Sequence, residues 1–221
     1  DLFVHNIAAM PPEWIDWALD AGHIAAVLKQ VLGRPELFKQ LALHFQQKVY
    51  CSEMACASAI ADLIPPEKLR EACTAVPLSA LQWCNANISL CNHLGETDGA
   101  DKWIREGENL IPLARAASLE AVVDFYNHYF VASHNRYQFQ PEIPSELNSI
   151  LPVLERQYQC QCEINCPTFP MLGRLYGTIA QNKAFCGPEF LPQTEAYAAG
   201  ARKALGEDTA PEYEEEWRRQ Y

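Results

Sequence analysis

Three cysteines lie close together at Cys160, Cys162 and Cys166, and Cys186 follows later in the chain. Thiolates in such a cluster could hold zinc or an iron–sulfur cluster. The C-x-C-x₃-C spacing, however, differs from the C-x₂-C pairs typical of metal sites. On a helix, Cys162 and Cys166 share a face that excludes Cys160. We therefore interpret these residues as packing thiols or an incidental redox pair, keep Cys160, Cys162 and Cys166 as weak metal candidates, and expect no cofactor.

The segment from Phe125 to Phe139 combines aromatic rings with His, Asn and Arg side chains. On a concave surface, the rings would supply contact area and the polar groups would give a ligand its direction. The alternative, which we favour, is a core helix followed by a polar turn. If the segment binds a ligand, the candidate residues are Tyr126, Tyr129, His134, Asn135, Arg136 and Tyr137.

No other residues form a recognisable catalytic pattern. The sequence contains no H-E-x-x-H, no G-x-S-x-G and no glycine-rich phosphate loop. We assign no catalytic residue and expect a protein that is not an enzyme.

The dipeptide Pro-Glu recurs along the chain and predicts helix starts. Proline suits the first helical position because its missing N–H would be unpaired there, and the following glutamate faces the positive end of the helix dipole. Pro141-Glu142 is the exception, which we expect in a loop with Pro144 starting the next helix. The predicted starts lie at residues 12–13, 35–36, 66–67, 188–189 and 211–212.

Apolar residues recur with helical spacing through most of the chain, and strand-like alternation is nearly absent. We expect a break in the long third helix between Tyr50 and Glu53, and helix ends at Gly33, Gly95 and Gly187. Short connections favour antiparallel neighbours, so the pattern predicts an all-α fold of stacked antiparallel helix hairpins. The predicted helices span 12–21, 23–32, 35–62, 66–75, 78–94, 97–116, 118–133, 145–164, 168–186, 189–205 and 210–221.

Two segments resemble tetratricopeptide (TPR) repeats. Segment 81–114 matches the family in its turn and second helix, but Cys84 stands where a Trp is typical, and Asn87-Ile88 replaces a Leu-Gly pair. Segment 169–205 carries the Leu-Gly-x-x-Tyr element as Leu172 to Tyr176, although its first helix is longer than the family's. The matching residues are Gly95, Ala100, Ile104, Gly107 and Pro112 in the first segment, and Leu172, Gly173, Tyr176, Tyr197, Ala201 and Ala204 in the second.

This resemblance implies a divergent TPR-like α-solenoid. Such repeats bind a peptide or a helix in a concave groove. The same architecture implies that Leu172, Tyr176 and Tyr197 are buried between adjacent helices.

Charge and cysteine content limit the partners and the compartment. The chain has 17 basic and 28 acidic residues, a formal net charge of −11, which disfavours nucleic acid and anionic membrane surfaces. No apolar run reaches the roughly 18 residues of a membrane span. Nine cysteines, an odd number, cannot all pair within one chain, and reduced thiols favour a cytoplasmic location.

We expect a single helical-repeat domain over 1–221, with a candidate division near 64–66. The lack of an initial Met and the helix-like C-terminal sequence lead us to expect a fragment of a longer protein. Our first hypothesis is a non-enzymatic module that binds a protein or peptide. The alternatives are an α-helical metal-binding or thiol-dependent enzyme using Cys160 to Cys166, and a regulatory segment of a larger protein.

Overall fold

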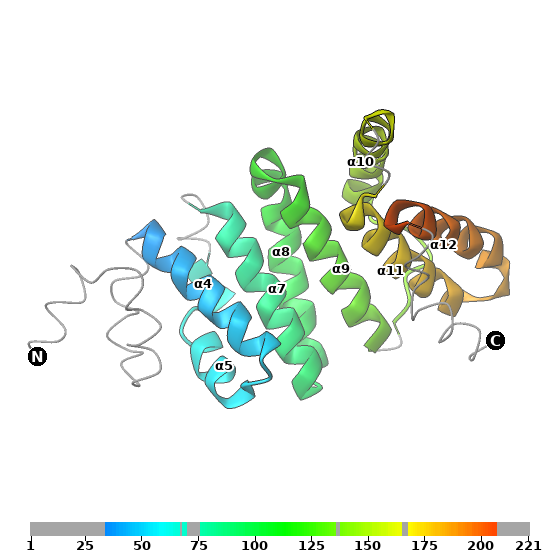
Figure 1. Cartoon of the computed structure of the whole chain (residues 1–221). Coiled ribbons are helices and arrows are strands. Elements are labelled where there is room, and N and C mark those ends of the chain that lie inside the picture. Colours follow the sequence, from blue (N-terminus) through cyan, green and yellow to red (C-terminus); the bar gives the residue numbers. More distant parts are fainter. Residues whose placement is uncertain (1–33, 67, 70–75, 136–137, 165–167, 207–221) are drawn as a thin grey trace, which may run out of the picture. The chain divides into compact units, whose positions relative to one another are not determined.

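The computed structural model describes residues 34–66, 68–69, 76–135, 138–164 and 168–206 (Figure 1). No strand occurs in these residues, which confirms the all-α class. Among these helices, none combines the length and the apolar character that crossing a bilayer requires. The elements are α4 (Pro35–Tyr50), α5 (Met54–Ala61), α7 (Pro77–Leu94), α8 (Thr97–Ala117), α9 (Leu119–Asn135), α10 (Ser145–Glu163), α11 (Pro170–Cys186), a 3-10 turn η2 (Pro188–Phe190) and α12 (Leu191–Leu205).

The predicted helix boundaries agree closely with the structure. The long third helix is broken as expected, because α4 ends at Tyr50 and α5 begins at Met54. Gly95 caps α7 in the left-handed conformation with φ of 73°, which glycine adopts without strain. Pro141 and Glu142 lie in a bend, and α10 begins directly after Pro144. The helices expected at 12–21, 23–32 and 210–221 lie outside the described residues, and that expected at 66–75 lies largely outside them.

By packing, the structure divides into two compact units between Phe125 and Tyr126, inside α9. Sequence reasoning placed a candidate division near 64–66, a region that falls within the first unit. Each unit has its own buried interior.

The first unit has an aromatic centre around Trp83 of α7. The Trp83 ring lies 5.9 Å from that of Phe38 and 4.7 Å from that of Phe45, both on α4, and all three side chains are fully buried. In α8, Gly107 lies directly against the Phe125 ring, so any larger side chain there would overlap that ring. Burial of apolar area is therefore the main stabilising contribution in this unit.

The second unit is built on the pairing of α11 with α12. Gly173 of α11 packs against Leu205, and Gly200 of α12 packs against the Tyr176 ring, so glycines allow the two helices to approach closely. Helix α10 adds one apolar face, formed by Leu147, Ile150, Leu151 and Leu154, all of which are buried. Pro152 lies inside α10 without ending it.

One packing prediction holds only in part. Leu172 is fully buried, as expected, but Tyr176 and Tyr197 are only partly buried. Their rings contact each other, with centroids 5.4 Å apart. The Tyr176 hydroxyl donates a hydrogen bond to the Glu155 carboxylate, which is exposed. The polar end of the Tyr176 ring therefore stays near the surface, and the expectation of burial between adjacent helices holds only in part for both tyrosines.

Candidate functional site

Helix α10 separates an apolar face from a long polar face. Its buried residues, Leu147, Ile150, Leu151 and Leu154, follow helical spacing along one side. The same period places Val153, Arg156, Gln157, Cys160 and Gln161 together on another side. The sequence of α10 thus presents a stripe of mixed polar and apolar groups outside its own core contacts.

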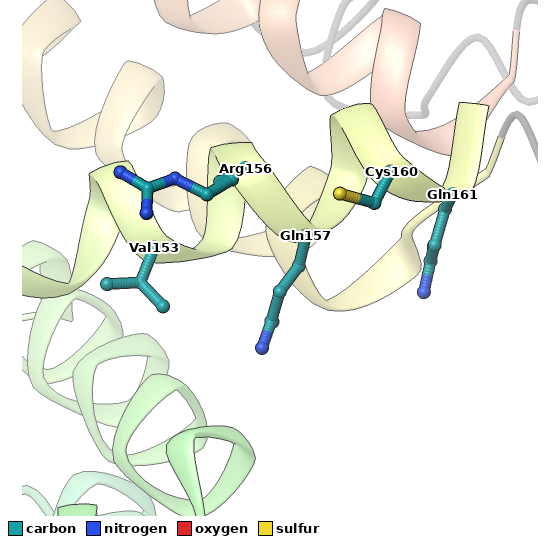
Figure 2. Close-up of a pocket in the computed structure, with 5 residues that line it drawn as sticks. All are labelled: Val153, Arg156, Gln157, Cys160 and Gln161. Atoms are coloured by element: carbon teal, nitrogen blue, oxygen red, sulfur yellow. The ribbon is translucent and has the colours of Figure 1, made fainter. Parts of the chain in front are cut away.

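These five residues line an open hollow of about 550 Å³, which we name the α10 hollow (Figure 2). Val153, Gln157 and Gln161, spaced four residues apart, point to the same side of the helix, and Arg156 and Cys160 form the adjacent row. Val153 is 39 % exposed, a large value for a branched apolar side chain. The described residues that line the hollow all come from one helix, so the site is an open surface.

Most of the side chains that line the α10 hollow are polar. Arg156 supplies a guanidinium group that forms no ion pair with any described residue. The Gln161 side-chain oxygen is buried and accepts no hydrogen bond within the described part of the chain. A guanidinium binds carboxylates through two parallel hydrogen bonds, so Arg156 can pair with an acidic group that enters the hollow.

The other sides of α10 are fixed by contacts within the second unit. The Tyr158 hydroxyl donates to the Lys203 carbonyl at 2.8 Å, and the Tyr158 ring stacks on Phe169 with centroids 6.4 Å apart. Burial, with a smaller contribution from the Cys162 thiol, raises the pKa of Tyr158. Burial, followed by the hydrogen bond to Glu155, raises the pKa of Tyr176. Both phenols therefore stay protonated near neutral pH and remain hydrogen-bond donors.

The residues singled out on α9 are not gathered into the α10 hollow. Tyr126 is 1 % exposed, Tyr129 and His134 are partly buried, and Asn135 is exposed. The Tyr129 ring contacts those of Tyr126 and Phe130, at 6.1 and 5.3 Å. Tyr126 and Tyr129 therefore pack against other aromatic side chains of α9. Arg136 and Tyr137 lie outside the described residues.

The clustered cysteines lie at the C-terminal end of α10. Cys160 and Cys162 are exposed, and Cys166 lies outside the described residues. Within the described ranges, no three His, Cys, Asp or Glu side chains are close enough to hold a metal ion together. Cys186 is a free, partly exposed thiol on α11, and burial raises its pKa.

Sequence reasoning missed Arg156, Gln157 and Gln161. Their helical spacing relative to Val153 was visible in the sequence. A polar stripe of this kind also occurs on any solvated helix face, however. Only the folded structure shows that this stripe lines a hollow and is not an ordinary solvent-exposed helix face.

Comparisons with protein-family models, curated proteins and solved structures find no match for this chain. The resemblance to TPR repeats therefore stays a prediction. Any functional assignment depends on the geometry and chemistry of the residues themselves.

Proposed function

We propose that this chain is a helical binding module that takes a protein or peptide partner at the α10 hollow. The observation that carries the proposal is the open hollow lined by Val153, Arg156, Gln157, Cys160 and Gln161 (Figure 2). It combines a partly exposed apolar group, a cation and amide groups on one helix face.

The openness of the hollow favours a macromolecular partner over a small ligand. Small-molecule sites are usually concave and bury most of the ligand surface. With one helix as its described wall, the α10 hollow would leave a small ligand largely in water. A protein partner brings a surface of its own to cover the other side, and arginine is enriched in such interfaces.

Charge indicates the polarity of the partner group. The chain carries a net charge of −11, yet among the described residues that line the hollow the charged one is Arg156. An acidic side chain of the partner would pair with this guanidinium. The proposal is thus a partner segment that presents a carboxylate to Arg156.

The proposal includes a TPR-like stacking of helix hairpins and a cytoplasmic location. Helices α7 and α8 pair closely, as do α11 and α12, and these pairs cover the two segments that resemble TPR repeats. Ala100 and Ile104 are buried, as the family's packing positions require. Among the described residues, five cysteines are free thiols, which supports a reducing compartment: Cys51, Cys91, Cys160, Cys162 and Cys186.

The test is partner capture with a matched pair of charge reversals. The wild-type chain, Arg156→Glu and Arg174→Glu are each used as bait in native lysate, and the bound proteins are identified by mass spectrometry. Arg174 is an exposed arginine of α11 outside the hollow. We expect a partner that binds the wild type and Arg174→Glu, and whose affinity in a subsequent titration falls by roughly tenfold or more for Arg156→Glu.

Equal retention of every bound protein by Arg156→Glu and by the wild type would contradict the proposal. Val153→Asp extends the test, because it removes the apolar contact without changing Arg156. Circular dichroism of each variant establishes that the fold is retained.

A further inference from the structure

Residues 138–144, the described part of the segment between α9 and α10, are named the connector, and main-chain groups of this connector bind to α11. The Gln140 N–H donates to the side-chain oxygen of Asn182 at 3.1 Å, and the Asn182 side-chain nitrogen donates to the Gln140 carbonyl at 2.6 Å. One amide group thus pairs with both backbone polar groups of a single residue. Asn182 is only 2 % exposed, so this double hydrogen bond lies in the interior of the second unit.

The residues on either side of Gln140 are held as well. The Lys183 ammonium group donates to the Pro141 carbonyl and lies 5.2 Å from the centroid of the Phe190 ring. Lys183 is 4 % exposed, so a buried cation is directed at a backbone oxygen. The Phe139 ring stacks on Phe185 with centroids 4.8 Å apart and planes inclined by 13°.

His134 completes the aromatic part of the surface. Its ring lies edge-on to Phe139 at 5.7 Å and to Phe185 at 4.9 Å. Three consecutive connector residues therefore each meet a different kind of contact on α11: an aromatic stack, a double backbone hydrogen bond and a charged donor.

This arrangement has the properties of a receptor for an extended peptide. Peptide-binding surfaces gain affinity from main-chain hydrogen bonds and specificity from side-chain contacts at fixed positions. The residue before a proline is biased toward an extended backbone, which presents its N–H and C=O for such pairing. Proline itself has no N–H that would need a partner, and its carbonyl remains available to Lys183.

We propose that Asn182, Lys183 and Phe185 form a binding site for an extended segment of the form aromatic-x-Pro, which the chain's own Phe139-Gln140-Pro141 occupies. We name this surface the connector site. A partner segment of the same form would bind by displacing the connector. The connector site shares no residue with the α10 hollow and is independent of the function proposed there.

The connector is covalently joined to the rest of the chain, and this determines how tightly a free peptide can bind the connector site. A segment joined to its site by short linkers is present at an effective concentration in the millimolar range. A free peptide therefore competes poorly in the wild-type chain, and loosening the connector should expose the site.

The test uses a fluorescein-labelled peptide with the sequence of residues 138–144, measured by fluorescence anisotropy. An opened full-length variant carries Phe139→Gly, Gln140→Ser and Pro141→Gly. We expect saturable binding to this variant at least roughly tenfold tighter than to the wild type. Adding Asn182→Leu should weaken that binding by roughly tenfold or more, because both backbone hydrogen bonds are lost.

Two controls keep the outcome decisive. A peptide of the same composition in scrambled order should bind at least roughly tenfold more weakly, because the site requires the aromatic-x-Pro order. Phe139→Ala alone serves as a milder opened variant if the triple substitution loses its helical circular dichroism. A folded opened variant that shows no saturable binding, or that binds both peptides equally, overturns the proposal.

Discussion

The α7–α8 and α11–α12 helix pairs have similar sequence patterns but are stabilised by different interactions. In α7, the interior includes Trp83 and Cys84, both fully buried, and Asn87, whose amide donates to the Trp83 carbonyl within the same helix at 2.8 Å. In α11, the buried polar residues Asn182 and Lys183 reach across to a different segment of the chain. Asn85 of α7 is also buried and donates to the Asp124 carboxylate of α9 at 3.1 Å. The pairs differ in what their long-range polar contacts meet: a side chain on a helix for Asn85, but main-chain groups of the connector for Asn182 and Lys183.

This difference indicates where binding chemistry can arise. An apolar interior is non-directional, so it stabilises a hairpin without selecting what lies beside it. Buried polar groups must find partners of defined geometry, so they select the segment that covers them. The two proposed binding surfaces, on α10 and on α11, both belong to the unit that contains the second pair.

The largest expected effect is on the aromatic centre of the first unit. Trp83→Ala removes a fully buried ring that contacts Phe38 and Phe45, and it should lower the free energy of unfolding by about 3–5 kcal/mol. Leu113→Ala, at a half-exposed position of α8, should change it by less than about 0.5 kcal/mol. Urea titration followed by circular dichroism measures both. Similar losses in the two variants would contradict the placement of Trp83.

Two helical glycines distinguish close packing from open space. A side chain at Gly107 would overlap the Phe125 ring, whereas one at Gly177 of α11 would meet no atom within 4 Å. Gly107→Ala should therefore destabilise by about 1–3 kcal/mol, and Gly177→Ala should stabilise by up to about 1 kcal/mol through helix propensity. Thermal melts of the two variants should shift in opposite directions. Shifts of the same sign would refute the close approach at Gly107.

A smaller, pH-dependent effect is expected at Tyr176. Tyr176→Phe keeps the ring and removes the hydrogen bond to Glu155, which should cost about 1 kcal/mol near neutral pH. Tyr176→Ala should cost less than the same change at Trp83, because the Tyr176 ring is only partly buried. Urea titrations at neutral pH give the free energies of unfolding of Tyr176→Phe, Tyr176→Ala and Trp83→Ala for direct comparison. A loss for Tyr176→Ala equal to that for Trp83→Ala would contradict this ranking.

The pKa of Tyr176 gives the sign of the pH dependence. Burial and Glu155 raise this pKa in the folded chain, so the unfolded chain releases the phenol proton first. The stabilisation is complete below the unfolded pKa of about 10 and is lost as the pH rises toward the folded value. Urea titrations between about pH 8 and pH 11 should show this decline in the wild type and a shallower one in Tyr176→Phe. Identical slopes would show that Tyr176 does not contribute.

The weakest effect concerns thiol reactivity and leaves stability unchanged. Burial, followed by the nearby Glu96 carboxylate, raises the pKa of Cys91 in α7 to about 11, whereas Cys160 and Cys162 are exposed. Because the thiolate is the reactive form, iodoacetamide at about pH 8 should label Cys160 and Cys162 at least roughly tenfold faster than Cys91. Peptide mass spectrometry measures the rates. In denaturant the three cysteines should react at the same rate. If Cys91 of the native protein reacted as fast as Cys160 and Cys162, that result would contradict its burial.

Much of the secondary structure could be predicted, because helix ends depend on local rules. Pro35 starts α4, Gly95 ends α7, and the break after Tyr50 lies where the pattern placed it. The degree of burial was less predictable. Tyr176 matched a packing position, yet the Glu155 carboxylate on another helix holds its hydroxyl near the surface.

The sequence by itself determined that the described part of this chain is helical, and it placed the helix ends close to those observed, since a proline or glycine acts within one turn of backbone. The tertiary structure alone decided which side chains meet. Asn182 and Gln140 lie 42 residues apart, and no local rule joins them. Likewise, Tyr126 faces inward and Val153 outward only because each helix has to bury one particular face against its neighbours. Both proposed binding surfaces follow from that choice of faces.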